Sequence, residues 1–99
     1  MTTRIRTHPG EVLREEYMAP LGLSANALAI ALRVPATRIG GIIATGSPRA
    51  VSPDTAMRLA RYFGTAPEFW LNLQTAYDLS KAQAKSGKSI ERDVRPRAA

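Results

Sequence analysis

The chain has 99 residues, no cysteine and a formal net charge of +6. This length favours one compact domain, and a hydrophobic content of 44% is enough to build its core. The absence of cysteine excludes disulfides, thiolate nucleophiles and cysteine-ligated zinc. The sequence has no apolar run of about 18 residues that could cross a membrane, and its N-terminus lacks a secretory signal pattern, so we expect a cytoplasmic protein without a membrane partner.

The positive charge lies toward the two ends of the sequence. Residues 1–50 carry six Lys or Arg against three Asp or Glu, and residues 81–99 carry six against two. Residues 51–80 carry two against three, so the middle of the chain is the expected core region. A basic balance of this kind is typical of proteins with a polyanionic partner, although it also occurs in proteins that never bind nucleic acid.

Helix-start and helix-end signals predict an all-α fold. His8-Pro9 places a proline in the first turn of a first helix, which ends at Gly22. Ser24 is a good N-cap for a second helix, and Pro35 opens a third. Ser52-Pro53-Asp54 combines an N-cap, a first-turn proline and an acid that faces the helix dipole, which predicts a fourth helix.

The fifth predicted helix begins at Pro67, after Gly64 closes the fourth in a left-handed conformation. We expect this fifth helix to fray before Gly87. Residues 1–86 then form the folded domain, and residues 87–99, which contain no aromatic residue, form a basic mobile tail. No stretch alternates apolar and polar residues for long enough to predict a strand.

The glycine-rich stretch RIGGIIATGS, residues 38–47, looks at first sight like a nucleotide-binding loop. Gly41 and Gly46 have the spacing of a phosphate-binding loop, but that loop needs Lys and then Ser or Thr after its last glycine. Ser47 and Pro48 stand there instead. A dinucleotide-binding loop needs GxGxxG between a strand and a helix, and the sequence offers neither the spacing nor the flanking elements. We therefore expect no cofactor.

The same stretch fits the second helix of a helix-turn-helix motif at about residues 24–44. Such a motif needs a small residue where its helices cross, which Ala29 provides, and an apolar residue in the turn, which is Val34. Ile39 and Ile42 would anchor the second helix to the core. The outward residues of that helix would meet the major groove of DNA: Ala36, Thr37, Arg38, Gly40 and Gly41.

Three stretches of the chain resemble the HigA antitoxin family, a branch of the Cro and phage-repressor-like helix-turn-helix proteins. They are HPGEVLREEYMAPLGLSANALAIAL, VSPDTAMRLARYFGTAPEFWLNLQTAYDL and the motif between them, and the resemblance extends over about residues 5–82. The most specific pieces are His8-Pro9-Gly10-Glu11 and the run PEFWLNLQ, residues 67–74.

The resemblance implies a five-helix, lambda-repressor-like domain with an antitoxin function. Members of the family typically neutralise a small ribosome-dependent toxin of the HigB type, which cleaves mRNA. As dimers they also repress their own operon by binding a palindromic operator. We therefore expect three partners: a HigB-type toxin protein, double-stranded operator DNA and a second copy of the chain.

The chain departs from the family pattern where DNA would be read. Arg33 stands where the turn usually has glycine, and a left-handed arginine there is strained by about 1 kcal/mol. Gly40 and Gly41 stand where polar residues are common, and each interior glycine costs about 1 kcal/mol against alanine. Ala25 begins the first helix of the motif, where the family often has glutamine.

Direct reading of bases would then rest on Thr37 and Arg38. Ser47 and Arg49 are further candidates, and Ser24 begins a helix whose N-terminus can hold a phosphate. Two explanations of the glycine pair stay open. The missing side chains let the backbone approach the groove closely, so that DNA shape adds to specificity, or the chain reads DNA weakly and is chiefly a toxin-binding module.

The fifth helix is the expected dimer interface. Trp70 and Tyr77 are seven residues apart and share one side of this helix. Packing inside the protomer and pairing across a two-fold seam both stay open for them. The candidate interface residues are Trp70, Leu73, Gln74 and Tyr77. A dimer would present its two third helices about 34 Å apart, to successive faces of the major groove.

Two other functions stay open beside the antitoxin hypothesis. A stand-alone transcriptional regulator would bind DNA without a toxin, and an interaction module would keep the fold with weak DNA reading. We do not expect an enzyme, because no nucleophile, base and orienting group and no set of metal ligands can be assembled from the sequence. His8 is the only histidine, and we expect it to begin a helix rather than to bind a metal.

Overall fold

The structure, a computed structural model, describes residues 4–98 and contains only helices and loops in that range. The first helix begins as α1 (Pro9–Val12) and continues without a break through a π-helical turn (Leu13–Met18) and a 3-10 turn (Ala19–Leu21). The other helices are α2 (Ala25–Leu32), α3 (Ala36–Ile42), α4 (Pro53–Phe63) and α5 (Pro67–Asp93). The all-α prediction is confirmed.

The helix caps predicted from the sequence are present. The side chains of His8, Ser24 and Ser52 each accept a hydrogen bond from a backbone N–H of the first helical turn, at 2.8, 3.0 and 3.3 Å. Gly22 and Gly64 close their helices in the left-handed region, with φ of 63° and 74°. These caps satisfy backbone groups that a helix leaves unpaired, and so they fix where each helix begins or ends.

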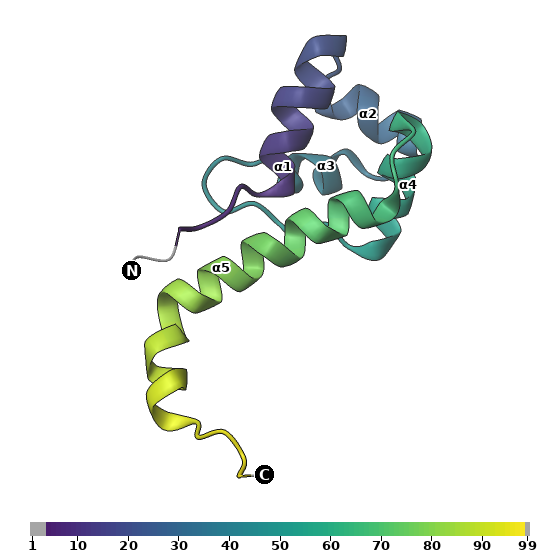
Figure 1. Ribbon diagram of the computed structural model, residues 1–99. Coiled ribbons are helices and arrows are strands. Elements are labelled where there is room, and N and C mark those ends of the chain that lie inside the picture. Colours follow the sequence, from purple (N-terminus) through teal and green to yellow (C-terminus); the bar gives the residue numbers. More distant parts are fainter. Residues whose placement is uncertain (1–3, 99) are drawn as a thin grey trace.

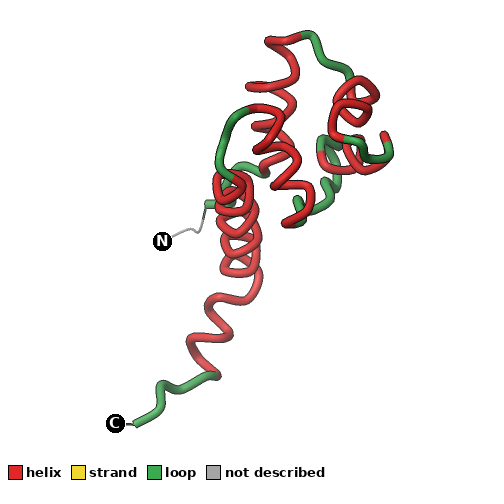
Figure 2. Tube along the Cα trace, turned by 90° about the vertical axis from the view of Figure 1, so that its right-hand side faces the viewer, coloured by secondary structure: helices red, strands yellow, loops and turns green. Residues whose placement is uncertain are grey.

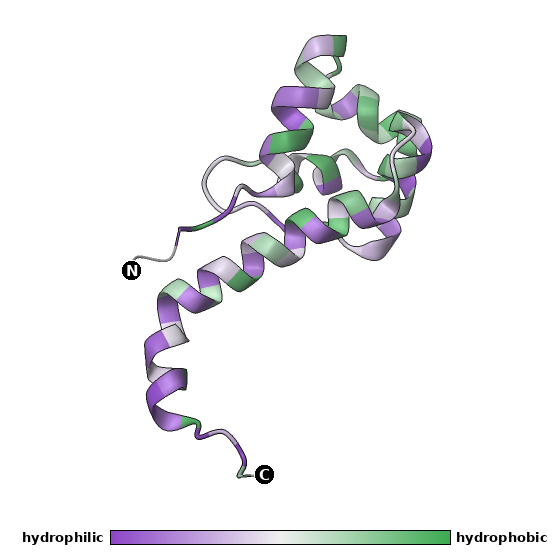
Figure 3. Ribbon diagram, viewed as in Figure 1, coloured by the Kyte–Doolittle hydropathy of each residue, from purple (hydrophilic) through white to green (hydrophobic). Residues whose placement is uncertain are grey.

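The first four helices enclose the core, and α5 lies along one side of it (Figure 1). Every helix contributes to one cluster of buried apolar side chains: Leu13, Met18, Leu28, Ala29, Leu32, Ile39, Ile42, Val51, Ala56, Leu59 and Trp70. Figure 3 shows apolar residues gathered where these helices face each other, whereas the last third of α5 is mostly hydrophilic. No helix within residues 4–98 is long and apolar enough to span a membrane.

The first helix approaches α3 so closely that only glycine fits at the contact. A Cβ on Gly10 would overlap the backbone carbonyl oxygen of Ile42. His8 supports this contact because its Nδ1 accepts the Gly10 N–H at 2.8 Å. Burial lowers the pKa of His8 below its ordinary value of 6.5, which favours the neutral ring, and a neutral ring can accept a hydrogen bond at Nδ1. The His8-Pro9-Gly10 motif therefore positions the first helix against the C-terminal end of α3.

The prediction that the fifth helix frays before Gly87 is wrong. α5 continues to Asp93, where the Val94 N–H donates to the Ile90 carbonyl at 2.8 Å. A single interior glycine costs about 1 kcal/mol, and the Lys, Ala, Gln and Glu residues around it are good helix formers. Residues 87–93 of the predicted tail are therefore helical. Figure 1 and Figure 2 show α5 extending well beyond the rest of the molecule.

Gly10→Ala is expected to destabilise the fold, because the added methyl group must push the first helix away from α3. Overpacking of this kind costs about 1–3 kcal/mol, which urea unfolding followed by circular dichroism would measure. Gly40→Ala is the matched control. Its Cβ would meet nothing within 4 Å, and alanine is the better helix former, so this variant should gain up to about 1 kcal/mol. Equal stability of the two variants would contradict the close contact.

Candidate nucleic-acid interface

α2 and α3 form the predicted helix-turn-helix. Ala29 is buried where the two helices cross, and Ile39 and Ile42 are buried beneath α3. Val34, in the turn, is half-buried against the same core. The structural roles expected for these residues are confirmed, and the other face of α3 is left at the surface.

The turn between α2 and α3 depends on Arg33, the one non-glycine residue within residues 4–98 that has a positive φ, at 62°. A left-handed arginine is strained by about 1–2 kcal/mol. Arg58 of α4 offsets part of this strain, because its Nη1 donates to the Leu32 carbonyl at 2.8 Å and so satisfies a C-terminal group of α2. α4 thereby holds the turn in place.

Asp54 connects Arg58 of α4 to Arg38 on the exposed face of α3. Its Oδ2 accepts hydrogen bonds from Arg58 Nε at 2.9 Å and from Arg38 Nη1 at 2.8 Å. These bonds, from Arg58 first and then Arg38, hold the pKa of Asp54 below its ordinary value of 3.8. Both pairs are solvent-exposed, so they orient the side chains more than they stabilise the fold. Arg38 is thus held in one direction, with its other N–H groups available to a ligand.

Thr37, Arg38 and Arg49 lie around one hollow of about 450 Å³ between α3 and the start of α4. Hydroxyl and guanidinium groups match phosphate oxygens and the acceptor atoms that guanine presents in the major groove. The carboxylate in this hollow, Asp54, is already paired with two arginines. No cluster of side chains that could hold a metal ion occurs within residues 4–98. The arrangement is suited to binding an anion or a base edge.

The two glycines of α3 have different roles. A Cβ on Gly40 would meet nothing within 4 Å, so the absence of this side chain leaves open space at the exposed face of α3. A Cβ on Gly41 would come within 2.8 Å of Arg49 Cδ, and the Gly41 carbonyl accepts the Arg49 N–H at 2.8 Å. The missing side chain of Gly41 therefore leaves room for the aliphatic part of Arg49 to lie against α3. This brings the Arg49 guanidinium to the face of α3, which already carries the guanidinium of Arg38.

The other predicted DNA contacts lie outside the hollow. Four of them are exposed at the surface of the motif: Ser24, Ala36, Gly40 and Ser47. Ala25 is half-buried and packs against the core, so little of it is left for DNA. Asp54 and Arg58 were not among the predicted site residues. Their spacing of four residues on one helix could have indicated them, because it places an acidic and a basic side chain next to each other.

Trp70 and Gln74 lie inside the protomer. Trp70 is 0% exposed, and its Nε1 donates to Thr65 Oγ1 at 2.8 Å. Gln74 is buried, and its Oε1 accepts the Val51 N–H at 2.8 Å. The structure thus corrects the assignment of these two residues to a dimer interface, because a side chain buried in its own protomer has no surface to offer a partner. The remaining two candidates are half-buried: Leu73 and Tyr77.

The two ion pairs of Asp54 predict a pH-dependent contribution to stability. The pKa of Asp54 is lower in the folded chain, so the contribution is present above the ordinary value of 3.8 and is lost as the pH falls through the folded value. Asp54→Asn should therefore lower the melting temperature near neutral pH, and its difference from the wild type should shrink below about pH 4. Thermal unfolding at several pH values measures this difference. A difference that stays constant down to about pH 2 would speak against the pairs.

Comparison with known proteins identifies relatives over most of the chain. Across 76 residues the chain is 57% identical to virulence-associated protein I of Dichelobacter nodosus, covering 77% of this chain and 68% of the relative. Across 78 residues it is 37% identical to antitoxin HigA-1 of Vibrio cholerae, covering 79% of this chain and 71% of the relative. No protein-family model matches the chain.

A solved structure of the Pseudomonas aeruginosa antitoxin HigA with the higBA promoter is similar over almost the whole chain. The TM-score is 0.88 and the sequence identity is 43%, and the match covers 96% of this chain and 100% of that one. The helices and the helix-turn-helix described above therefore share the architecture of that antitoxin. The chain belongs to the HigA antitoxin family of helix-turn-helix transcriptional regulators, which are not enzymes.

Proposed function

We propose that the chain is a cytoplasmic antitoxin that neutralises a HigB-type mRNA-cleaving toxin and represses its own operon by binding palindromic DNA as a homodimer. The observation that carries the DNA-binding part is the hollow beside α3, where Thr37, Arg38 and Arg49 gather. A relative of the same fold is a HigA antitoxin solved with its promoter. The antitoxin part is supported by membership of the HigA family.

Arg38 and Thr37 are the side chains that read bases in this proposal. Asp54 holds one end of the Arg38 guanidinium, which leaves the rest to form hydrogen bonds with a guanine edge. The open space above Gly40 lets the backbone of α3 come close to the groove. Arg49, lying on Gly41, adds a positive charge for a phosphate or a second base.

Binding to the DNA upstream of its own gene tests this function. The purified chain is titrated against that DNA and against a scrambled duplex of equal length, each at two salt concentrations. A preference for its own DNA that persists at the higher salt is expected from a protein that reads bases. Equal and salt-sensitive binding to both duplexes would refute operator recognition and leave the toxin as the main partner.

Variants of α3 distinguish sequence-specific contacts with bases from nonspecific electrostatic attraction to DNA. Arg38→Ala should reduce the preference for the operator about 5- to 150-fold for each half-site, because one good bidentate contact is worth about 1–3 kcal/mol of discrimination. Gly40→Ser should weaken operator binding although the free protein has room for its side chain. Arg61→Ala, an exposed arginine on α4, is the control and should bind as the wild type does. If all three variants behave alike, the assignment of α3 as the reading helix is wrong.

We propose that the homodimer forms through the C-terminal part of α5. Leu79, Ile90 and Val94 are 55%, 54% and 64% exposed. Leu79 and Ile90 are eleven residues apart on α5, which places them on one face at about 3.6 residues per turn, and Val94 is the residue that follows the end of the helix. Exposed apolar side chains on one face of a projecting helix and at its end suit pairing with a second copy. We call these three residues the apolar stripe.

Ile90→Glu is expected to dissociate the dimer, because pairing would bury two unpaired carboxylates at the seam. Sedimentation equilibrium would show a shift from dimer to monomer, and operator affinity would fall because each half-site would be bound separately. Ala84→Glu introduces the same charge on α5 away from the apolar stripe, so it should leave the dimer intact. A dimer that survives Ile90→Glu would place the seam elsewhere.

Toxin neutralisation has a separate readout. A HigB-type toxin added to a cell-free translation reaction lowers protein synthesis, and an equimolar amount of the chain should restore it. Failure to restore synthesis, together with selective operator binding, would make the chain a regulator without this toxin.

A further inference from the structure

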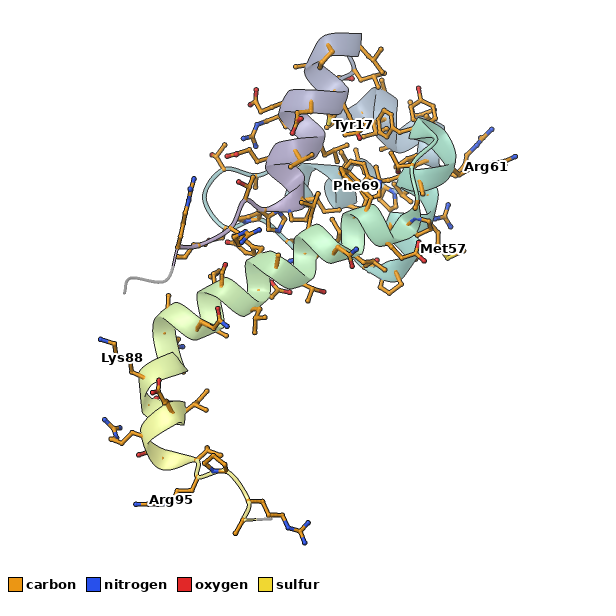
Figure 4. All side chains as sticks on the ribbon, viewed as in Figure 1. Tyr17, Met57, Arg61, Phe69, Lys88 and Arg95 are labelled. Carbon is orange, nitrogen blue, oxygen red and sulfur yellow. The ribbon has the colours of Figure 1, made fainter. Side chains whose placement is uncertain are left out.

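The positive charges near the C-terminus lie in a line along α5. Lys81, Lys85, Lys88 and Arg92 recur at intervals of four, three and four. At about 3.6 residues per turn this spacing keeps them within one narrow band, which is about 16 Å long at 1.5 Å per residue. All four side chains are at the surface. We call this band the cationic stripe, and Figure 4 shows its Lys88 projecting from the part of α5 that extends past the body.

The cationic stripe is largely unpaired within the protein. Among residues 4–98 its one ion pair joins Arg92 to its neighbour Asp93, at 3.0 Å. Lys81 lies over the ring of Tyr77, 5.2 Å from the ring centre. Like charges at these spacings destabilise an isolated helix by a few tenths of a kcal/mol each, about as much as opposite charges would stabilise it. Lysine is a good helix former and Arg92 lies in the last turn, where a cation suits the helix dipole, but neither effect requires the four cations to share one band. A polyanionic partner would use that arrangement.

The cationic stripe begins beside the loop that follows α3. Gln74 and Tyr77 precede Lys81 by seven and four residues, so they share its face of α5. Gln74 binds the backbone of Val51 at the end of that loop. Tyr77 packs on the N-terminal segment, where its ring centre lies 4.7 Å from that of His8. The stripe thus continues the face of α5 that packs on the N-terminal segment and on the end of the loop after α3.

The apolar stripe lies on the opposite face of the same helix. Leu79 and Ile90 each stand two residues from a member of the cationic stripe, which is about 200° around the helix, and Val94 follows the last residue of the helix. Pairing of two α5 helices through the apolar stripe therefore leaves the cations at the surface. In this arrangement α5 presents one face to a second copy of the chain and the opposite face to a different partner.

We propose that the cationic stripe binds the phosphate backbone of operator DNA next to the segment that α3 reads; this inference rests on the proposed function. DNA carries one phosphate per 3.4 Å of axis on each strand, so the stripe is about as long as the axial rise of five base pairs. Lysine is a flexible point charge that suits phosphate without reading sequence. The contact adds affinity and salt dependence, and it leaves base preference to α3.

The triple variant Lys81→Gln, Lys85→Gln, Lys88→Gln tests the stripe. Glutamine is nearly as good a helix former as lysine, and circular dichroism would verify that the helix is intact. Operator affinity is measured over a series of salt concentrations, on a core duplex and on one extended by about one helical turn, or 10 base pairs, at each end. The wild type should bind the extended duplex more tightly, and the variant should not. The slope of log K against log salt should become shallower by about 0.9 for each phosphate that the variant no longer neutralises.

A matched comparison removes the effect of net charge alone. Lys88→Gln and Arg61→Gln each delete one positive charge at the surface, but Arg61 lies on α4, at the other end of the molecule in Figure 4. Only Lys88→Gln should reduce the salt slope. Neither variant should change the ratio of affinities for operator and scrambled DNA.

The outcomes separate this inference from the proposed function. If the triple variant keeps the wild-type slope and length dependence while still preferring the operator, the stripe proposal is wrong and operator recognition stands. If the wild type lacks operator preference but the variant still has the shallower slope, the stripe binds DNA and the proposed function is wrong. If the variant binds DNA normally but has a lower affinity for the toxin, the stripe is a protein-binding surface and the proposal is overturned.

Discussion

The left-handed turn at Arg33 is the constraint on which the recognition surface depends. The chain reverses there over very few residues, with the Val34 N–H donating to the Ala29 carbonyl at 3.0 Å, and this sets how α3 is presented. A strained backbone conformation persists only where its surroundings over-determine it. Arg58 supplies that support by binding the Leu32 carbonyl, and through Asp54 the same side chain orients an arginine of α3. α4 therefore supports both the turn that precedes α3 and the side chain of Arg38 on α3.

The loop between α3 and α4 is held from both sides, although it has no regular structure of its own. Its Arg49 N–H donates to the Gly41 carbonyl, and its end is fixed where Gln74 of α5 accepts the Val51 N–H. Surface loops are usually the most mobile parts of a domain. Here the buried amide of Gln74 ties the loop to the longest helix, so the position of Arg49 relative to α3 is set by the core.

Local signals predicted most of the helices, and contacts between distant elements were the part that could not be predicted. N-caps and left-handed glycine ends depend on residues within one turn, so Ser52 and Gly64 could be identified from the sequence alone. The ion pair between Asp54 and Arg38 and the packing of Arg49 on Gly41 each join residues from separate elements, and sequence spacing does not encode such contacts. Periodicity placed Trp70 on an apolar side of α5, but a core and a dimer seam are both apolar, so it could not separate the two. The predicted end of α5 before Gly87 is wrong because one interior glycine does not outweigh the good helix formers on both sides of it.

The composition of α3 implies that affinity and specificity come from different elements. A reading helix with two glycines offers few side chains to the bases, so each half-site contributes only a few kcal/mol of discrimination, at about 1–3 kcal/mol for each good base contact. In the proposed dimer, two copies on a palindrome would double that discrimination, so pairing through α5 would serve specificity as well as assembly. Phosphate contacts supply most of the remaining affinity and none of the base preference. With the cations on α5 and the base contacts on α3, salt and operator sequence would act on separate parts of the chain.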